Sequence, residues 1–375
     1  MCIRDSSEEF MKRLGELEKD PELLEYPKNF QFKAFQDFQN TDAEFSMVLL
    51  AENLSKLKEE IIQAQKSVSR CFEDGKDWQT PSGSFFTTKP LGQEKIAFVY
   101  PGGFNTYVGS GNSLFEMDPE LHERSLSYSS TIKTLLHPEF LFPQSPSIQS
   151  EEELKQLQQQ FYDSPNPMFE SGISSAVLAT QVMRNAFGIE PHAAFGYSMG
   201  EVSMLFSLGV WGSMDPMSEV LNASPLFHER IAGPMNSVRE YWKLKDTDFQ
   251  NESLWNWYTL RAEPELVAKA LEKRERVYLV LINTPQEVVI AGEPSACKEL
   301  IEELKCESHE IPVTDVVHCP PVQSEYEEIK KVHTNKVVDK PKVDFFSAAD
   351  YTTTSLDSEI LADNIARFYL SLIHI

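Results

Sequence analysis

The chain has 375 residues, of which 41% are hydrophobic, so it can bury the core of one large domain or of two smaller ones. Its 58 acidic and 34 basic residues give a formal net charge of −24, which argues against nucleic acid or an anionic membrane as a partner. The five cysteines form no Cys-x-x-Cys pair, which favours a reduced, cytoplasmic protein without a cysteine metal site. The N-terminus is polar and no apolar run has the length of a membrane span, so we expect neither a signal peptide nor a transmembrane helix.

The two ends of the chain differ from the rest in character. Met-Cys-Ile-Arg-Asp-Ser at residues 1–6 and Ser-Leu-Ile-His-Ile at residues 371–375 resemble translated sequencing-adapter sequence. We leave both segments out of the fold argument and expect the chain to be a piece of a longer protein.

The first ninety residues carry weak structural signals. Residues 7–40 are charged and aromatic without a clear hydrophobic period, and we interpret them as a linker. The apolar run at residues 45–51 predicts a strand, and Asn53 is placed to cap the helix that follows. Glu59 and Glu60 are expected on the solvent-exposed face of that helix.

Stronger signals follow. Residues 96–100 form a continuous apolar run of buried-strand length, which ends at Pro-Gly-Gly, residues 101–103. Ser150 and Glu153 form a capping-box pattern at the start of a polar helix. A further helix is predicted over residues 172–187, and the chain then enters another buried strand.

That strand leads into Gly-Tyr-Ser-Met-Gly-Glu, residues 196–201, which predicts a strand, a very tight turn and a helix. Gly196 and Gly200 flank Ser198 because such a turn brings the strand and helix backbones too close together for side chains. The serine hydroxyl then projects outward above the free N–H groups of the helix N-terminus. A nucleophile that accepts an acyl group needs this geometry, although Gly-x-Ser-x-Gly also arises by chance in long chains.

A second alternation of elements follows the serine. Strand, helix, strand, strand, helix and strand are predicted in this order, which is that of a ferredoxin-like unit. Their ranges are 257–260, 264–273, 277–282, 288–291, 294–304 and 309–313. Because a strand at 343–346 and a helix at 363–370 resume afterwards, we expect this unit to be an insert in a larger α/β domain.

A serine nucleophile needs a base within hydrogen-bond reach. Of the eight histidines, His318 ends an apolar run and precedes Pro320-Pro321, which fixes a loop. A histidine at a strand end also occurs for purely structural reasons, so the residues alone leave both interpretations open.

The ordered set of motifs resembles the acyltransferase domains of fatty-acid and polyketide synthases, which share the malonyl-CoA:acyl-carrier-protein transacylase fold. Within this family, the segments around Tyr100 and Ser198 are most similar to acyltransferases of polyunsaturated fatty-acid synthases. The stretches that carry the resemblance are residues 98–103, 196–201 and 316–320, supported by Asn-Thr-Pro at 283–285 and Val-Ile-Ala-Gly at 289–292.

The resemblance implies an α/β fold, with a hydrolase-like core built on a parallel sheet and an inserted ferredoxin-like subdomain. We expect the core at residues 93–250 and 314–370 and the insert at 251–313. Residues 7–92 resemble the linker between a ketosynthase-type domain and an acyltransferase domain.

The resemblance also implies a mechanism. His318 takes the proton of Ser198, which attacks an acyl thioester such as acyl-CoA, and the acyl group then moves to the phosphopantetheine thiol of an acyl carrier protein. The backbone N–H groups of Gly103 and Met199 are implied to form the oxyanion hole, and Glu201 completes the nucleophile turn. No bound cofactor or metal is expected; the expected partners are the carrier protein, acyl-CoA and neighbouring ketosynthase-type domains.

The sequence departs from the family in three respects. Gly103 stands where the family usually has glutamine. Because the expected oxyanion-hole donor is the backbone N–H group, glycine retains this donor. Malonyl-specific members carry an arginine after the nucleophile that pairs with the substrate carboxylate, whereas residues 221–227 have none and Arg230 is the only nearby substitute. We therefore expect an uncharged acyl chain as the substrate. Finally, the carbonyl that orients the histidine is expected beyond the end of this chain, which would leave His318 loosely held.

Because a backbone carbonyl is expected to orient the histidine, no acidic residue is required as a third catalytic group beside Ser198 and His318. Asp315 is close in sequence, but alternation along a strand would turn its side chain away from His318. Two alternatives remain open. A serine thioesterase or hydrolase of α/β type would need an acidic residue between the serine and the histidine, for which Asp246 and Asp248 are candidates. A non-catalytic structural domain of a synthase would need neither Ser198 nor His318.

Overall fold

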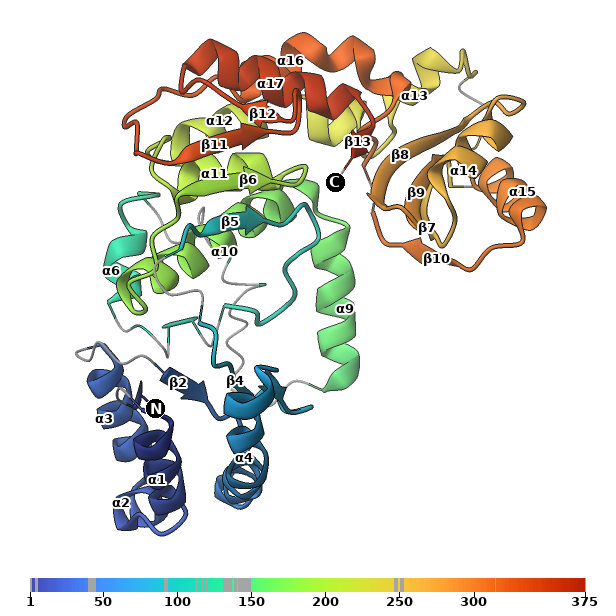
Figure 1. Cartoon of the computed structure of the whole chain (residues 1–375). Coiled ribbons are helices and arrows are strands. Elements are labelled where there is room, and N and C mark those ends of the chain that lie inside the picture. Colours follow the sequence, from blue (N-terminus) through green and yellow to red (C-terminus); the bar gives the residue numbers. More distant parts are fainter. Residues whose placement is uncertain are drawn as a thin grey trace. The chain divides into compact units, whose positions relative to one another are not determined.

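The structure is a computed structural model that describes residues 2–3, 6–39, 45–90, 94–111, 114–115, 118, 120–130, 137, 140, 150–245, 249, 253–313 and 315–374. The chain divides into two compact units, Met1–Glu94 and Lys95–Ile375, and each is described by itself (Figure 1). In the described residues, no helix has both the length and the apolarity to cross a membrane.

The first unit packs helices against a small antiparallel sheet. The sheet has the order β1-β2-β4-β3. Its strands are β1 (Cys2–Ile3), β2 (Phe45–Val48), β3 (Trp78–Gln79) and β4 (Phe85–Phe86), and its helices are α1 (Ser7–Leu17), α2 (Pro21–Glu25), α3 (Pro27–Gln39) and α4 (Leu54–Asp74). Residues 7–39, for which the sequence shows no clear hydrophobic period, are largely helical in the structure. α1 buries Phe10, Leu14 and Leu17. These three residues have helical spacing, but a pattern of three positions is too short to identify a helix from the sequence.

The long helix α4 confirms one prediction of the sequence and corrects another. The Asn53 side chain accepts a hydrogen bond from the Lys56 N–H at 3.0 Å, so it caps the helix as expected. Glu60 does not lie on the exposed face. Its side chain is buried and accepts a hydrogen bond from the Thr80 hydroxyl at 2.8 Å. A carboxylate can be buried in this way because the hydrogen bond offsets part of the cost of removing it from water.

The second unit is built on a sheet of order β12-β11-β6-β5. β5 (Ala97–Tyr100), β6 (Ala193–Gly196) and β11 (Asp344–Ser347) run parallel, and β12 (Thr352–Thr353) is antiparallel to β11. The helices of the core are α6 (Leu121–Ser125), α9 (Glu151–Tyr162), α10 (Pro165–Asn185), α11 (Gly200–Ser207), α12 (Asp215–Ala223), α13 (Asn236–Tyr241), α16 (Tyr326–Val332) and α17 (Ser358–Leu370), with a π-helical turn at Leu226–Arg230 and a 3-10 turn at Pro320–Glu325. The predicted capping box of Ser150 and Glu153 opens α9.

The predicted ferredoxin-like order of elements is confirmed. β7 (Asn256–Leu260), α14 (Pro264–Leu271), β8 (Val277–Thr284), β9 (Glu287–Gly292), α15 (Pro294–Leu304) and β10 (Ser308–Ile311) follow one another. Their strands form an antiparallel sheet of order β10-β7-β9-β8, which β13 (Ile373–His374) extends by pairing parallel to β8. Both helices of the insert lie against this sheet (Figure 1).

The turn between β6 and α11 depends on two glycines. A Cβ atom on Gly196 would lie 2.0 Å from the Glu201 nitrogen, and one on Gly200 would lie 2.2 Å from the Tyr100 carbonyl oxygen. The strand, the helix and the neighbouring β5 are therefore in backbone contact around Ser198, as the sequence predicted.

Glu201, at the start of α11, connects this helix to β11. Its carboxyl group is fully buried and accepts hydrogen bonds from the Ser347 hydroxyl at 2.9 Å and the Ala348 N–H at 3.0 Å. Burial raises the pKa of Glu201 to about 7, against the opposing effect of these two hydrogen bonds.

We predict that Gly196→Ala destabilises the chain by at least about 2 kcal/mol, because the strand and helix must separate to admit the methyl group. Urea unfolding measures the effect. Gly212→Ala is the matched control, since its Cβ would meet only the Val338 side chain at 3.4 Å. Equal unfolding midpoints for the two variants would contradict the backbone contact.

A second prediction concerns the pH dependence of stability. Because the folded-state pKa of Glu201 lies above the ordinary value of 4.5, the folded state keeps a proton that the unfolded state releases between these values. The free energy of unfolding should therefore fall as the pH rises from 5 to 7, by on the order of 2 kcal/mol relative to Glu201→Gln. Urea titrations at several pH values test this, with the exposed Glu327→Gln as control; parallel curves for wild type and Glu201→Gln would refute it.

Candidate active site

Ser198 lies at the tight turn with an unusual backbone conformation. Its φ of +53° is in the left-handed region, which a residue with a side chain occupies only when the surrounding structure enforces it. The turn directs the Ser198 hydroxyl to His318, and Oγ lies 2.9 Å from Nε2 of the imidazole. The structure thus brings together the serine and the histidine that the sequence singled out.

His318 is held on its other side by the end of α17. Its Nδ1 lies 2.8 Å from the Phe368 carbonyl oxygen, and its backbone N–H donates to the Tyr369 carbonyl at 2.7 Å. Because a carbonyl only accepts, Nδ1 carries the proton and Nε2 has a free lone pair. The expectation that the orienting carbonyl lies beyond this chain is therefore wrong: Phe368 supplies it, and His318 is fixed rather than loose.

Burial also sets the charge of this histidine. His318 is 2% exposed, and desolvation lowers its pKa to about 4, although the hydrogen bond to Phe368 acts in the opposite direction. The imidazole is therefore neutral at physiological pH, and Nε2 can accept the Ser198 proton.

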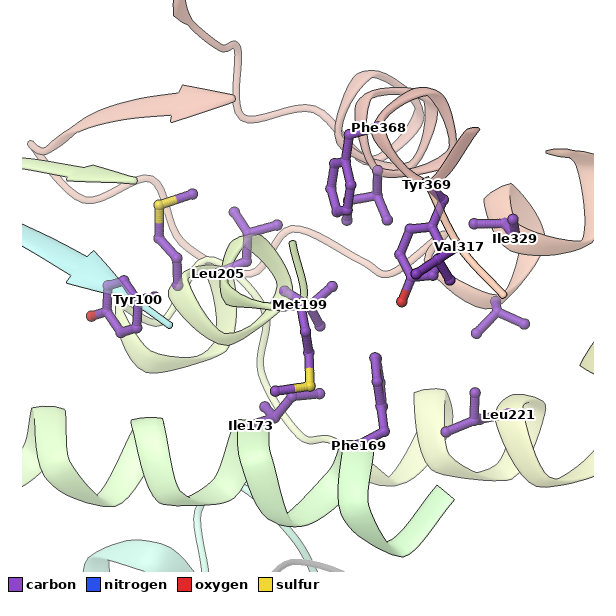
Figure 2. Close-up of a cluster of buried hydrophobic side chains, with 14 of the residues drawn as sticks. Tyr100, Phe169, Ile173, Met199, Leu205, Leu221, Val317, Ile329, Phe368 and Tyr369 are labelled. Carbon is purple, nitrogen blue, oxygen red and sulfur yellow. The ribbon is translucent and has the colours of Figure 1, made fainter. Parts of the chain in front are cut away.

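The two residues predicted for the oxyanion hole lie beside the serine. Gly103 and Met199 line the same cavity as Ser198, and Met199 directly precedes the first residue of α11. A Cβ atom on Gly103 would meet nothing within 4 Å, so a methyl group would fit at this position without contact. Met199 belongs to the same buried hydrophobic cluster as Phe169 and Ile173 of α10, Val317 and Tyr369 (Figure 2). The remaining residues of the predicted turn, Gly196, Gly200 and Glu201, are placed as described above.

Ser198 and His318 open into a cavity of about 350 Å³ between the core and the ferredoxin-like insert. Its walls are mainly apolar. The core contributes Phe104, Met168, Phe169, Phe227, Val317 and Tyr369, and the insert contributes Trp257, Leu281, Val289 and Ile311. Among the described lining residues none is lysine or arginine. The site can therefore hold an apolar chain next to the serine hydroxyl.

Arg230, the expected substitute for the missing arginine, does not serve this cavity. Its guanidinium forms a two-pronged pair with Glu240, at 2.6 and 2.8 Å, and also donates to Glu325 at 2.7 Å. These pairs raise its pKa further and use its hydrogen-bond donors. Arg230 is thus committed to structural contacts.

Asp315 lines the same cavity as His318, but its Oδ1 atom is buried without a hydrogen-bond partner, so the structure gives it no place as a third member of the triad. Strand alternation does not apply here because β10 ends at Ile311. The segment is held instead by a hydrogen bond of 2.9 Å from the Trp257 indole N–H to the Asp315 carbonyl oxygen. Of the acidic residues proposed for a hydrolase triad, Asp246 and Asp248 fall outside the described residues.

One contact between the nucleophile turn and the insert was not predicted. The Tyr197 hydroxyl donates to the Asn283 side-chain oxygen at 3.0 Å, and the Asn283 amide donates to Glu287 at 2.9 Å. The Asn-Thr-Pro motif at 283–285 was the signal available in the sequence. In the described part of the chain, no group of three or more His, Cys, Asp or Glu side chains is arranged to hold a metal ion.

Comparison with known proteins agrees with this architecture. No family model matches the chain. It is 29% identical over 329 residues to one subunit of the polyunsaturated fatty acid synthase of Thraustochytrium sp., covering 85% of this chain but only 16% of that relative. The acyltransferase domain of module 8 of the salinomycin polyketide synthase superposes with a TM-score of 0.64 at 18% identity, covering 97% of this chain and 76% of that one.

A malonyl-transacylase solved in complex with a type II polyketide synthase acyl-carrier protein superposes with a TM-score of 0.55 at 17% identity, covering 75% of this chain and 82% of that one. The chain therefore has the fold of the acyltransferase domains of polyketide synthases, and its sequence is similar to part of a polyunsaturated fatty acid synthase subunit.

Proposed function

We propose that this domain transfers an acyl group from a thioester, such as acyl-CoA, through a Ser198 ester to the phosphopantetheine thiol of an acyl carrier protein. One observation carries the proposal: Ser198 Oγ, the imidazole of His318 and the Phe368 carbonyl form a hydrogen-bonded series at the end of an apolar cavity. This series supplies a nucleophile, a neutral base and a group that fixes the base.

The reaction has two matched halves. His318 Nε2 takes the Ser198 proton while Oγ attacks the thioester carbonyl, and the same proton then passes to the departing CoA sulfur. In the second half, Nε2 takes the proton of the pantetheine thiol, whose sulfur attacks the ester, and Ser198 Oγ leaves with that proton. The backbone N–H groups of Gly103 and Met199 stabilise the oxyanion of each step. Loss of one such donor costs on the order of 10²–10³ in rate.

The acyl group that fits the site is uncharged. The described walls of the cavity are mainly apolar and include no lysine or arginine, and Arg230 is paired elsewhere. A malonyl carboxylate would therefore be buried without a partner, which is unfavourable. The related transacylases act on malonyl groups by name, so this domain would differ from them in its cargo.

The domain would work within a larger assembly. This chain spans only 16% of the length of the related synthase subunit, and the solved transacylase complex contains a carrier protein. We propose residues 93–250 and 314–370 as the acyltransferase core, 251–313 as its insert and 7–92 as the linker region that follows a ketosynthase-type domain. Tethering of the carrier within one cytoplasmic synthase would raise its effective concentration next to this acidic domain.

The first prediction for activity concerns covalent loading. Incubation with acetyl-, hexanoyl-, palmitoyl- and malonyl-CoA should give an ester on Ser198 with the uncharged chains in preference to malonyl, as read by intact mass. Ser198→Ala should give no ester, and His318→Ala should slow loading by at least about 10³-fold. Subsequent transfer to a holo-carrier protein supports the proposal, whereas rapid release of free acid would identify a thioesterase. Absence of any ester would identify a structural domain, and a preference for malonyl would refute the assignment of the cargo.

The second prediction follows from the burial of His318. Because its pKa is about 4, Nε2 stays unprotonated well below neutrality, so the rate of Ser198 loading should change little between pH 8 and pH 6. The rate should fall only as the pH approaches 4, and stability must be checked in parallel by circular dichroism. A roughly fourfold loss of rate between pH 7.5 and 6, as expected for an ordinary imidazole with a pKa of about 6.5, would show that His318 titrates as an exposed imidazole does.

A further inference from the structure

Asp315 is the one acidic side chain among the described residues that line the cavity. Its Oδ1 atom is buried and has no hydrogen-bond partner, which is costly for a carboxylate and calls for a reason in function. Burial also raises the pKa of Asp315 to about 6, so the group is ionised at pH 8.

The influence of this carboxylate extends to the residues around it. Together with burial, the charge of Asp315 raises the pKa of Tyr369 and of Cys319. Tyr369 is itself part of the cavity wall. Asp315 therefore places a negative charge within the wall of the space in which an acyl chain would lie.

A backbone hydrogen bond acts against the effect of burial, but no cationic side chain among the described walls compensates for this charge. They contain no lysine or arginine, and His318, the basic group that is present, is neutral because burial lowers its pKa to about 4. An uncharged acyl chain would meet apolar walls, whereas an acyl group with a free carboxylate would meet a like charge in a poorly solvated space.

We infer that Asp315 determines specificity by charge, excluding thioesters whose acyl group ends in a carboxylate and admitting uncharged chains. This inference rests on the proposed acyl transfer and names the residue that restricts its substrate. For like charges about 6 Å apart at an effective dielectric constant of about 20, repulsion weakens binding by roughly 100-fold. Removing the charge should therefore raise relative malonyl loading by roughly 10- to 100-fold.

The test compares substrates and variants at pH 8 with the full chain. Equimolar malonyl-CoA and hexanoyl-CoA compete for Ser198, and intact mass gives the ratio of the two esters. Asp315→Asn keeps the shape of the side chain without its charge. The matched control is Asp344→Asn, which removes an exposed carboxylate at the start of β11, outside the cavity.

We expect Asp315→Asn to raise the malonyl-to-hexanoyl ratio at least tenfold and Asp344→Asn to leave it unchanged. A second measurement needs no variant: the wild type should load the methyl ester of malonyl-CoA, in which the free carboxylate is masked, at least tenfold faster than malonyl-CoA itself.

Each of the remaining outcomes overturns the inference. Asp315→Asn could load hexanoyl with an unchanged malonyl-to-hexanoyl ratio, or the wild type could load malonyl-CoA and its methyl ester equally fast. Either result would show that Asp315 does not select by charge, while the proposed acyl transfer would still stand. Absence of every ester in the wild type would remove the proposed function and this inference with it.

Discussion

The position of His318 between two oxygen atoms is the constraint on which the site depends. Nδ1 donates to the Phe368 carbonyl at 2.8 Å, so Nε2 is left as the acceptor that faces Ser198 Oγ at 2.9 Å. A carbonyl at this place fixes the tautomer without adding a charge, and burial then keeps the imidazole neutral. A backbone group at the end of α17 therefore does the positioning for which many serine enzymes use a carboxylate.

The serine is held as firmly by backbone geometry. Gly196 and Gly200 bring β6, α11 and β5 into contact, and Ser198 is consequently held at a positive φ. The adjoining Tyr197 reaches the insert through Asn283. The insert and the core thus meet next to the nucleophile and together enclose an apolar cavity that ends at the reacting hydroxyl.

Much of this arrangement could be predicted because it is encoded locally. The turn around Ser198 and the cap at Asn53 each require particular residues at particular spacings, and the ferredoxin-like order appears in the alternation of short apolar runs. Features that depend on tertiary contact could not be predicted. Asp315 lines the cavity in a segment that lies beyond the end of β10, and the carbonyl of Phe368 has no signature in the sequence. The hydrogen bond that satisfies the buried carboxylate of Glu60 likewise comes from Thr80, twenty positions away in the sequence.

The most direct test of the account is the reactivity of Ser198 towards a fluorophosphonate, which labels activated serines without requiring the correct acyl group. We predict a single adduct on the peptide that contains Ser198, formed much more slowly in His318→Ala and at a rate that is nearly constant between pH 8 and pH 6. Absence of labelling, or labelling that does not depend on His318, would show that the 2.9 Å contact between these residues does not activate the serine.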